Sequence, residues 1–428
     1  MMKTNRWRAG LWLVFLLDLL LVAAPAQTAD EWQFQDDDSL ETLQAKIVHN
    51  GYSFTVGHNW VFDMPLEQKK RFFSRHQTRQ PRVYGVSDDI GPLAEHLGKT
   101  LPASFDWRNY NGHSYIGRVR NQGYCGSCYA FAAAASAEGV YNLAKGLTDT
   151  KCANFSESFI IWCLGRLSSY NSHFFGCDGA DYDYMELEAL TKEGISREAK
   201  FPYTIEDPGS CTHWSDPRVK FSEWHRIPCS DVNTIKTAIM TYGAVDVAVY
   251  VTSAFEAYSG GIYQDTNTSC YSAPCDYTPT NHAVALVGWD DATQTWILRN
   301  SWGSSWGENG YMRIKFKSAR VACEATYLVF NSPPGIHVAS PVAGTDWKKG
   351  TTKKVVWLKN GALASNVKIE LLKGGVPALT ISSLTANDGK HNWTIPSTLA
   401  AAADYAVRIT TADDAYSDTS ELFTISEP

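Results

Sequence analysis

Two cysteines three residues apart stand before an alanine-rich run, in the stretch QGYCGSCYAFAAAASAE (residues 122–138). The Gly-Ser pair between them favours a tight turn, and the residues from Tyr129 to Gly139 are strong helix formers that end at a glycine. Cys128 is therefore predicted to begin a helix, where unpaired backbone N–H groups and the helix dipole favour a thiolate. Thiolate attack on a carbonyl also requires a proton carrier and donors for the oxyanion.

A histidine and an asparagine further along the chain have the residue types for these tasks. His282 begins the apolar run HAVALVGW, which is typical of a strand, and Asn300 ends the next predicted strand before a loop rich in glycine and tryptophan. An Asn amide at that place can hold the imidazole in one tautomer and leave its other nitrogen facing the sulfur. A lone histidine is more often structural, so the prediction for His282 depends on the cysteine and the asparagine together.

Two other chemistries use a close cysteine pair. A structural zinc site needs a second pair, and Cys270 and Cys275 are available, but their spacing fits zinc poorly. A thioredoxin-like redox motif needs a βαβ context, and no parallel-sheet pattern precedes Cys125. A nucleophilic cysteine is therefore the favoured interpretation.

The length, cysteine count and net charge limit the class of protein to which the chain can belong. The chain has 428 residues, which predicts two or three domains, and all 10 cysteines lie between Cys125 and Cys323, which indicates one domain held by disulfides. The net charge is -7 and no long Lys/Arg block occurs, so a nucleic-acid partner is not expected.

The first residues have the layout of a secretory signal: a basic start, an apolar run and a small-residue site at residues 24–26. The apolar run covers only the 14 residues 11–24 and contains Asp18, whereas a membrane-spanning helix needs about 20. We therefore expect a signal peptide at 1–26 and a mature protein without a transmembrane anchor. The predicted location is secreted, in an extracellular, periplasmic or lysosome-like compartment.

Two further regions flank the cysteine-containing part. The polar segment 27–100 contains predicted helices at 39–49 and 65–76 but too few apolar residues for a core of its own. After the Pro-Pro-Gly linker, five short alternating runs separated by turn residues predict a small all-β sandwich over 335–428.

Three blocks resemble, in order, the signatures of papain-like cysteine peptidases: QGYCGSCYAF, NHAVALVGW and RNSWGSSWGENGYMRI. The resemblance implies an α+β fold over 101–331, with a helical lobe and a β-barrel-like lobe. It also implies Cys128 as nucleophile, His282 as proton carrier and Asn300 as orienter of the imidazole. The oxyanion hole would consist of the Gln122 side chain and the Cys128 N–H. No metal or organic cofactor is implied. Tyr129 and the sequence NHAV (residues 281–284) are similar to the cathepsin C branch.

The same resemblance implies disulfides. Cys125 would pair with Cys177, and Cys163 with Cys211. Apart from Cys128, five cysteines remain: Cys152, Cys229, Cys270, Cys275 and Cys323. Because five is an odd number, at least one of them is free or pairs outside the chain. Cys323 is expected to pair with Cys270 or Cys275.

By resemblance, substrate would contact the backbone of Gly179 and Ala180, together with Trp302 and Leu328. Asp181 lies near the expected pocket for the second residue before the scissile bond. A carboxylate there would favour Lys or Arg, and the alternative is a solvated surface acid.

The flanking regions have resemblances too. GYSFTVGHNWVFDM (residues 51–64) is similar to the propeptide motif Gly-x-Asn-x-Phe-x-Asp, with Val61 where Phe is usual. Segment 27–100 is therefore expected to be an inhibitory propeptide that is cleaved shortly before Leu101. The part after 335 resembles the immunoglobulin-like module of secreted, cell-wall-associated proteins, and either a passive spacer or a contact with cell envelope or polysaccharide fits that module.

Together these features predict a secreted cysteine endopeptidase made as a zymogen, with protein or peptide substrates and its own propeptide as inhibitor. Two alternatives stay open. One is an exopeptidase or transpeptidase with the same triad, and the other is an adhesion protein with a vestigial peptidase domain. The presence of Gln122, Cys128, His282 and Asn300 together argues against a vestige.

Overall fold

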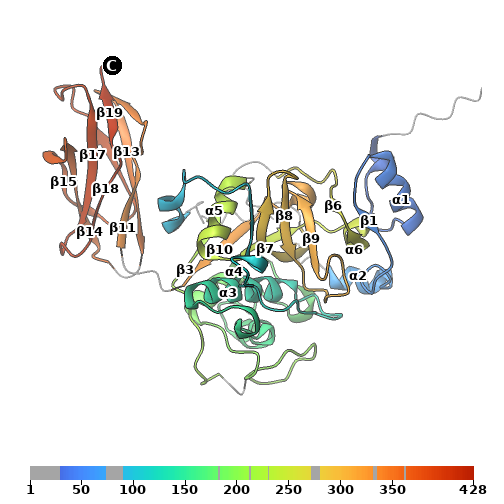
Figure 1. Cartoon of the computed structure of the whole chain (residues 1–428). Helices are drawn as coiled ribbons and strands as arrows, with labels where there is room; N and C mark the ends of the chain where they lie inside the picture. Colours follow the sequence, from blue (N-terminus) through green and yellow to red (C-terminus); the bar gives the residue numbers. More distant parts are fainter. Residues whose placement is uncertain are drawn as a thin grey trace, which may run out of the picture.

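The computed structural model describes residues 29–73, 90–181, 184–211, 214–229, 231–270, 280–330, 335–360 and 363–428. A central unit of two lobes carries an N-terminal segment at one end, and a separate β unit lies at the other end (Figure 1). The predicted signal peptide, 1–26, lies outside the described residues. In the part of the chain that is described, no helix combines the length and the apolar character needed to cross a membrane.

The helical lobe is built around α3 (Cys128–Lys145), which is buried along most of its length. Its alanines allow close packing against the sheet of the other lobe. The helix was expected to end at Gly139, and that prediction is wrong. A Cβ at Gly139 would lie 2.8 Å from the Ala244 Cβ, so glycine is required there by close packing. The helix continues to Lys145 and is capped by the left-handed Gly146 (φ 63°).

Shorter helices complete this lobe. The π-helix η5 (Phe159–Cys163) and α4 (Met185–Lys192) pack with α3 around a core that includes Phe155 and Leu190. Among the described residues, the central unit also has five short 3₁₀ helices: η3 (Trp107–Asn109), η4 (Asp149–Lys151), η6 (Leu164–Arg166), η7 (Gly176–Asp178) and η8 (Ser318–Arg320).

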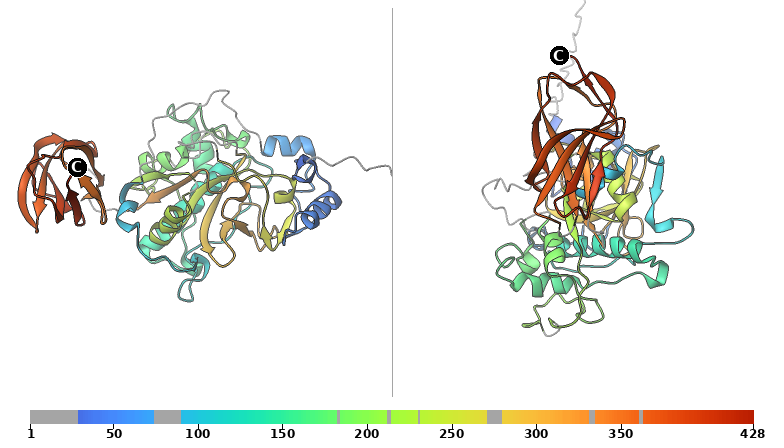
Figure 2. Two further views of the ribbon diagram at one scale, coloured as in Figure 1. Left: turned by 90° about the horizontal axis from the view of Figure 1, so that it is seen from above. Right: turned by 90° about the vertical axis from the view of Figure 1, so that its left-hand side faces the viewer.

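The second lobe is a mostly antiparallel sheet with strand order β3-β10-β4-β7-β8-β9-β6, and β2 pairs with β7. Helix α5 (Val232–Tyr242) packs on β7 and β10 (Figure 2). The strands are β2 (Ser104–Asp106), β3 (Glu223–Ile227), β4 (Val245–Val249), β6 (Ile262–Tyr263), β7 (His282–Asp290), β8 (Thr295–Arg299), β9 (Tyr311–Lys315) and β10 (Ala325–Val329). The expected α+β fold is confirmed.

The N-terminal segment packs on the central unit. Its elements are η1 (Ala29–Trp32), α1 (Leu40–His49), β1 (Thr55–Val56), α2 (Leu66–Phe72) and η2 (Gly91–His96). Strand β1 pairs with β5 (Tyr258–Gly260), which follows the short helix α6 (Ser253–Glu256). Phe34, Leu43 and Val61 belong to the same hydrophobic core as the sheet lobe. The segment therefore uses the core of its neighbour, as its composition predicts.

The C-terminal unit is the expected all-β region. One sheet has the order β11-β13-β16 and the other β12-β19-β17-β14-β15, with β18 on β17. Trp347, Trp357 and Trp393 are all buried between the sheets. The strands are β11 (Gly335–Ser340), β12 (Asp346–Lys348), β13 (Thr352–Asn360), β14 (Asn366–Lys373), β15 (Val376–Ala386), β16 (Lys390–Thr394), β17 (Ala402–Thr411), β18 (Ser417–Thr419) and β19 (Phe423–Ser426).

Candidate active site

The predicted nucleophile is the first residue of α3. The Cys128 sulfur accepts backbone hydrogen bonds from the N–H groups of Ala283 and Tyr129, which places it beside the residue that follows His282. These two donors favour the thiolate, but burial outweighs them and raises the pKa of Cys128 to about 11. The thiol is therefore protonated at neutral pH in this form of the protein.

His282 and Asn300 lie together at the start of β7 and just after β8. The His282 Nε2 and the Asn300 Oδ1 are 2.8 Å apart, while the His282 Nδ1 is buried and has no hydrogen-bond partner among the described residues. Trp302 stacks on the imidazole with ring centroids 4.7 Å apart. Burial lowers the pKa of His282 to about 4, so the ring is neutral, and the Asn300 bond fixes the tautomer with hydrogen on Nε2.

Gln122 is fully buried between the two lobes. Its Nε2 donates to the Cys125 carbonyl at 2.8 Å, and its Oε1 accepts from the Ser301 hydroxyl at 2.6 Å. These two bonds fix the amide plane. Because the NH₂ group has two hydrogens, one N–H remains for a further acceptor.

The loop before α3 is tied to the Gly179 region by the disulfide Cys125–Cys177. The Gly126 N–H donates to the Cys177 carbonyl at 2.9 Å, so two chain segments run side by side next to the thiol. Gly179 has φ 99°, which is accessible mainly to glycine, and Ala180 forms a β-bridge with Phe174. Both predicted backbone contacts thus lie on the segment that this disulfide fixes.

The other cysteines have definite states as well. The expected pair Cys163–Cys211 is present, and Cys323 pairs with Cys270, one of the two partners left open. Cys152 is free, as the odd count requires. Cys229 is disulfide-bonded, and Cys275 lies outside the described residues. Because the Cys125 and Cys270 sulfurs are both in disulfides, they are not zinc ligands.

Two predicted pocket residues have surroundings that the sequence did not indicate. The Asp181 side chain is only 3% exposed and forms an ion pair with His173, with Oδ2 and Nδ1 3.3 Å apart. Asp181 is therefore not a solvated surface acid. Leu328 is fully buried in the core of the helical lobe, a core on which Ala180 packs.

The N-terminal segment covers the site. The edge of the Phe73 ring faces His282, with centroids 6.2 Å apart, and Phe72 and Phe73 both contact the Trp302 ring. Trp60 donates through Nε1 to the Trp302 carbonyl at 2.9 Å. These aromatic side chains exclude water from the imidazole, which is consistent with its low pKa.

The motif around Gly57 makes the anchoring contacts. The Gly57 N–H donates to the Ala257 carbonyl at 2.8 Å, and Asn59 donates through Nδ2 to the Glu256 carbonyl at 2.8 Å. Val61, which stands where the motif usually has Phe, is fully buried. The smaller side chain is therefore still accommodated as part of the core.

The Glu256 side chain binds the same segment. The Lys69 Nζ lies 2.6 Å from its Oε2, and both side chains are largely buried. Burial raises the pKa of Glu256 to about 7, although Lys69 opposes that shift. This ion pair was not predicted, because its members are far apart in the sequence.

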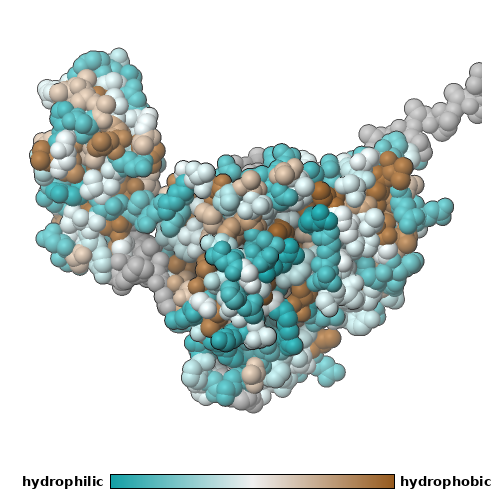
Figure 3. Space-filling view, in the orientation of Figure 1, coloured by the Kyte–Doolittle hydropathy of each residue, from teal (hydrophilic) through white to brown (hydrophobic). Residues whose placement is uncertain are grey.

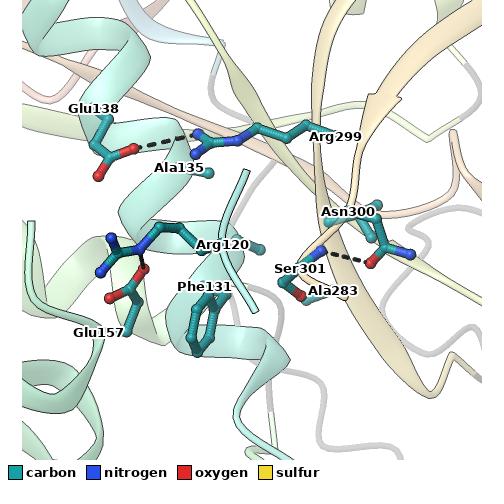
Figure 4. A pocket seen from close by; sticks show the side chains of 11 residues that line it. Arg120, Phe131, Ala135, Glu138, Glu157, Ala283, Arg299, Asn300 and Ser301 are labelled. Atoms are coloured by element: carbon teal, nitrogen blue, oxygen red, sulfur yellow. Dashed lines mark hydrogen bonds and ion pairs between the residues drawn. The ribbon is translucent and has the colours of Figure 1, made fainter. Parts of the chain in front are cut away.

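A pocket lined in part by Asn300 and Ser301 contains buried ionisable side chains that the sequence analysis missed (Figure 4). Arg120 pairs with Glu157, and Arg299 pairs with Glu138 of α3. Burial raises the pKa of Glu157 to about 8, so this carboxyl holds a proton at neutral pH. One available signal was Glu138, an acidic residue inside an alanine-rich helix.

Comparisons with known proteins agree with this geometry. Residues 101–330 match the family described as papain family cysteine protease, and residues 340–425 match the Kre9/KNH-like N-terminal Ig-like domain. The chain is 31% identical over 261 residues to Thiol protease SEN102 of Hemerocallis, covering 58% of this chain and 66% of that protein. It is 32% identical over 329 residues to Cysteine proteinase 2 of Entamoeba histolytica, covering 73% of this chain and 98% of that protein.

A solved structure supports the fold. Digestive procathepsin L 3 of Tenebrio molitor superimposes with a TM-score of 0.55 and 28% identity, covering 68% of this chain and 88% of that chain. These relatives do not single out the cathepsin C branch. The family match covers more than half of the sequence, and its residues contain the Cys128, His282 and Asn300 arrangement. The chain belongs to the papain family of cysteine proteases.

Proposed function

We propose that this protease is a secreted endopeptidase, made as a zymogen, that cleaves peptide bonds through a Cys128 and His282 pair. One observation carries the proposal. Asn300 binds the Nε2 of His282, and Nδ1 has no hydrogen-bond partner within the described part of the chain. The next residue along the chain, Ala283, contacts the Cys128 sulfur through its N–H. This is the arrangement that proton transfer between thiol and imidazole requires.

In the first half of the reaction, the thiol proton passes to the His282 Nδ1 and the thiolate attacks the substrate carbonyl carbon. The oxyanion accepts hydrogen bonds from the Cys128 backbone N–H and from the remaining N–H of Gln122. When the tetrahedral intermediate collapses, the C–N bond breaks, and His282 gives its proton to the leaving amine. The product is a thioester on Cys128.

In the second half, a water molecule attacks the thioester and gives a proton to His282. The C–S bond then breaks, His282 returns its proton to the Cys128 sulfur, and the product leaves as a carboxylic acid that releases its proton to solvent. Asn300 and the stacked Trp302 keep the imidazole in one orientation throughout, since both contacts involve parts of the ring that do not react.

We propose that residues 27–73 act as the inhibitory part of the propeptide. Phe72, Phe73 and Trp60 occupy space over His282 and Trp302, and a substrate would need that space. Extended substrate would bind along Gly179 and Ala180, with Trp302 bordering the cleft and the buried Leu328 in the core on which Ala180 packs. Asp181 would favour a basic side chain, although His173 already contacts one of its carboxylate oxygens.

The C-terminal domain is proposed to contact cell-envelope polysaccharide. The support is its match to the Kre9/KNH-like Ig-like domain and its position at the far end from the covered site (Figure 1). A pull-down of the whole protein on insoluble cell-envelope polysaccharide tests this. Retention should disappear when 335–428 is deleted, and equal retention of both forms would exclude the proposal.

The test of the enzymatic proposal is labelling with an epoxysuccinyl peptide probe that alkylates active-site thiols. We expect no labelling of the precursor, strong labelling after removal of the N-terminal segment, and none in Cys128→Ala. Cys152→Ala, which removes the other free thiol among the described residues, should label like the wild type. Absence of labelling in every matured form would refute the proposal, and product analysis on a long peptide separates endopeptidase from exopeptidase cleavage.

A further inference from the structure

The short stretch 90–97 packs on a different part of the protease domain from the rest of the N-terminal segment. It contains η2, and Leu93 is fully buried in the core of the sheet lobe. Gly91 has φ 50° and lies so close to His225 that a Cβ would be 2.1 Å from the imidazole Cε1. Only glycine fits such a close approach, so this stretch is packed as tightly as a core element.

Aromatic contacts anchor both ends of η2. The Tyr327 hydroxyl of β10 donates to the Ile90 carbonyl. Tyr327 stacks on Tyr242 of α5, with ring centroids 5.1 Å apart, and Tyr242 meets the edge of His96 at 6.1 Å. These partners all belong to the 101–330 domain. The contacts are therefore independent of the covered active site.

The outer side of η2 touches the C-terminal domain, through β11 and β13. The His337 Nδ1 on β11 lies 3.7 Å from the Glu95 Oε1 and 3.0 Å from the Asp418 Oδ2. The two neighbouring carboxylates raise the pKa of His337 although burial opposes them, so the pair with Glu95 gains charge at mildly acid pH.

The position of η2 in the molecule separates it from the inhibitory part. Helices α1 and α2 lie at one end of the central unit, whereas the segment coloured for residues 90–100 lies at the other end, facing the C-terminal domain (Figures 1 and 2). On the face shown in Figure 3, the C-terminal domain and the central unit meet over a narrow region.

We infer that residues 90–97 are a permanent part of the mature enzyme and form the surface on which the C-terminal domain docks. The inhibitory function is then confined to the part of the segment that precedes Ile90. This inference rests on the proposed zymogen function, because it concerns what remains after the N-terminal segment is removed. The removable propeptide would then end before Ile90 and not just before Leu101.

Native mass spectrometry of the matured protein tests the retention. We expect a mass that includes residues 90–97, whether joined to Leu101 or held after a cut in the exposed stretch 98–100. A native mass without 90–97 overturns the inference. The same sample is labelled with the epoxysuccinyl probe. If the enzymatic proposal is wrong, labelling is absent; if only this inference is wrong, labelling is present but the native mass lacks residues 90–97.

The docking is tested with Glu95→Lys, which places a second positive charge beside His337. We expect an increase in the radius of gyration measured by X-ray scattering and several-fold faster cutting of the junction between the two domains by an added protease. Cleavage of a small peptide substrate should be unchanged. The matched control is Glu206→Lys, an exposed residue of the helical lobe that stays in the mature enzyme. Equal scattering and equal cutting of Glu95→Lys, the control and wild type would overturn the docking role.

Discussion

Removing the N-terminal segment should convert a neutral thiol and imidazole into an ion pair. In the covered form, burial raises the pKa of Cys128 to about 11 and lowers the pKa of His282 to about 4. Both shifts favour the uncharged form of the group. When water regains access to the site, the desolvation cost falls, and the helix N-terminus and the neighbouring imidazolium favour the thiolate.

The size of the effect follows from these values. At pH 7, a thiol with a pKa of about 11 is ionised to only about one part in 10⁴. Activated cysteines in such positions have pKa values of roughly 3.5 to 7.5, so at least about a quarter of the mature enzyme would hold the thiolate at pH 7. We therefore expect the thiolate fraction to rise by at least about a thousand-fold on maturation.

Thiolate absorbance near 240 nm measures this directly, as the difference between wild type and Cys128→Ser, which cancels the signal of Cys152. The precursor should show no step between about pH 4 and 9, because its raised thiol pKa lies above that range. The mature enzyme should show a step below about pH 7.5. A precursor with the same step as the mature enzyme would refute the argument, since covering the site would then not control ionisation.

Other perturbations test the remaining contacts. Gln122→Ala should lower kcat by about 10²- to 10³-fold with little change in KM, and an unchanged kcat would exclude an oxyanion role. Lys69→Met leaves the Glu256 carboxyl buried without its cation. The inhibition constant of the isolated segment 27–73 against the mature enzyme should therefore rise roughly 30-fold, which corresponds to about 2 kcal/mol of binding free energy. The exposed Lys70→Met is the control and should inhibit like wild type. Gly139→Val forces a side chain into a 2.8 Å gap and should destabilise the fold by about 1–3 kcal/mol in thermal unfolding; an unchanged Tm would show that α3 can shift.

The sequence predicted those parts of the site that depend on residues close together in the chain. Cys128 at a helix start and His282 at a strand start follow from neighbouring residues, and the alternating runs after 335 predicted the sandwich. The buried Arg120 and Glu157 pair and the packing of η2 were missed. Both depend on contacts between segments far apart in the chain, and a polar segment with one buried leucine gives no periodic signal. The error at Gly139 has the same origin, because glycine is needed there for a tertiary contact.

The Glu256 carbonyl has one partner in the protease domain and a second in the N-terminal segment. This oxygen accepts from the Trp306 Nε1 at 2.9 Å and from the Asn59 Nδ2 at 2.8 Å. A carbonyl oxygen has two lone pairs, and one of them is permanently used by Trp306 within the protease domain. When Asn59 departs, the carbonyl keeps a partner, so no buried acceptor is left unsatisfied. For this carbonyl, attachment of the segment adds a second hydrogen bond, and departure of the segment removes only that one.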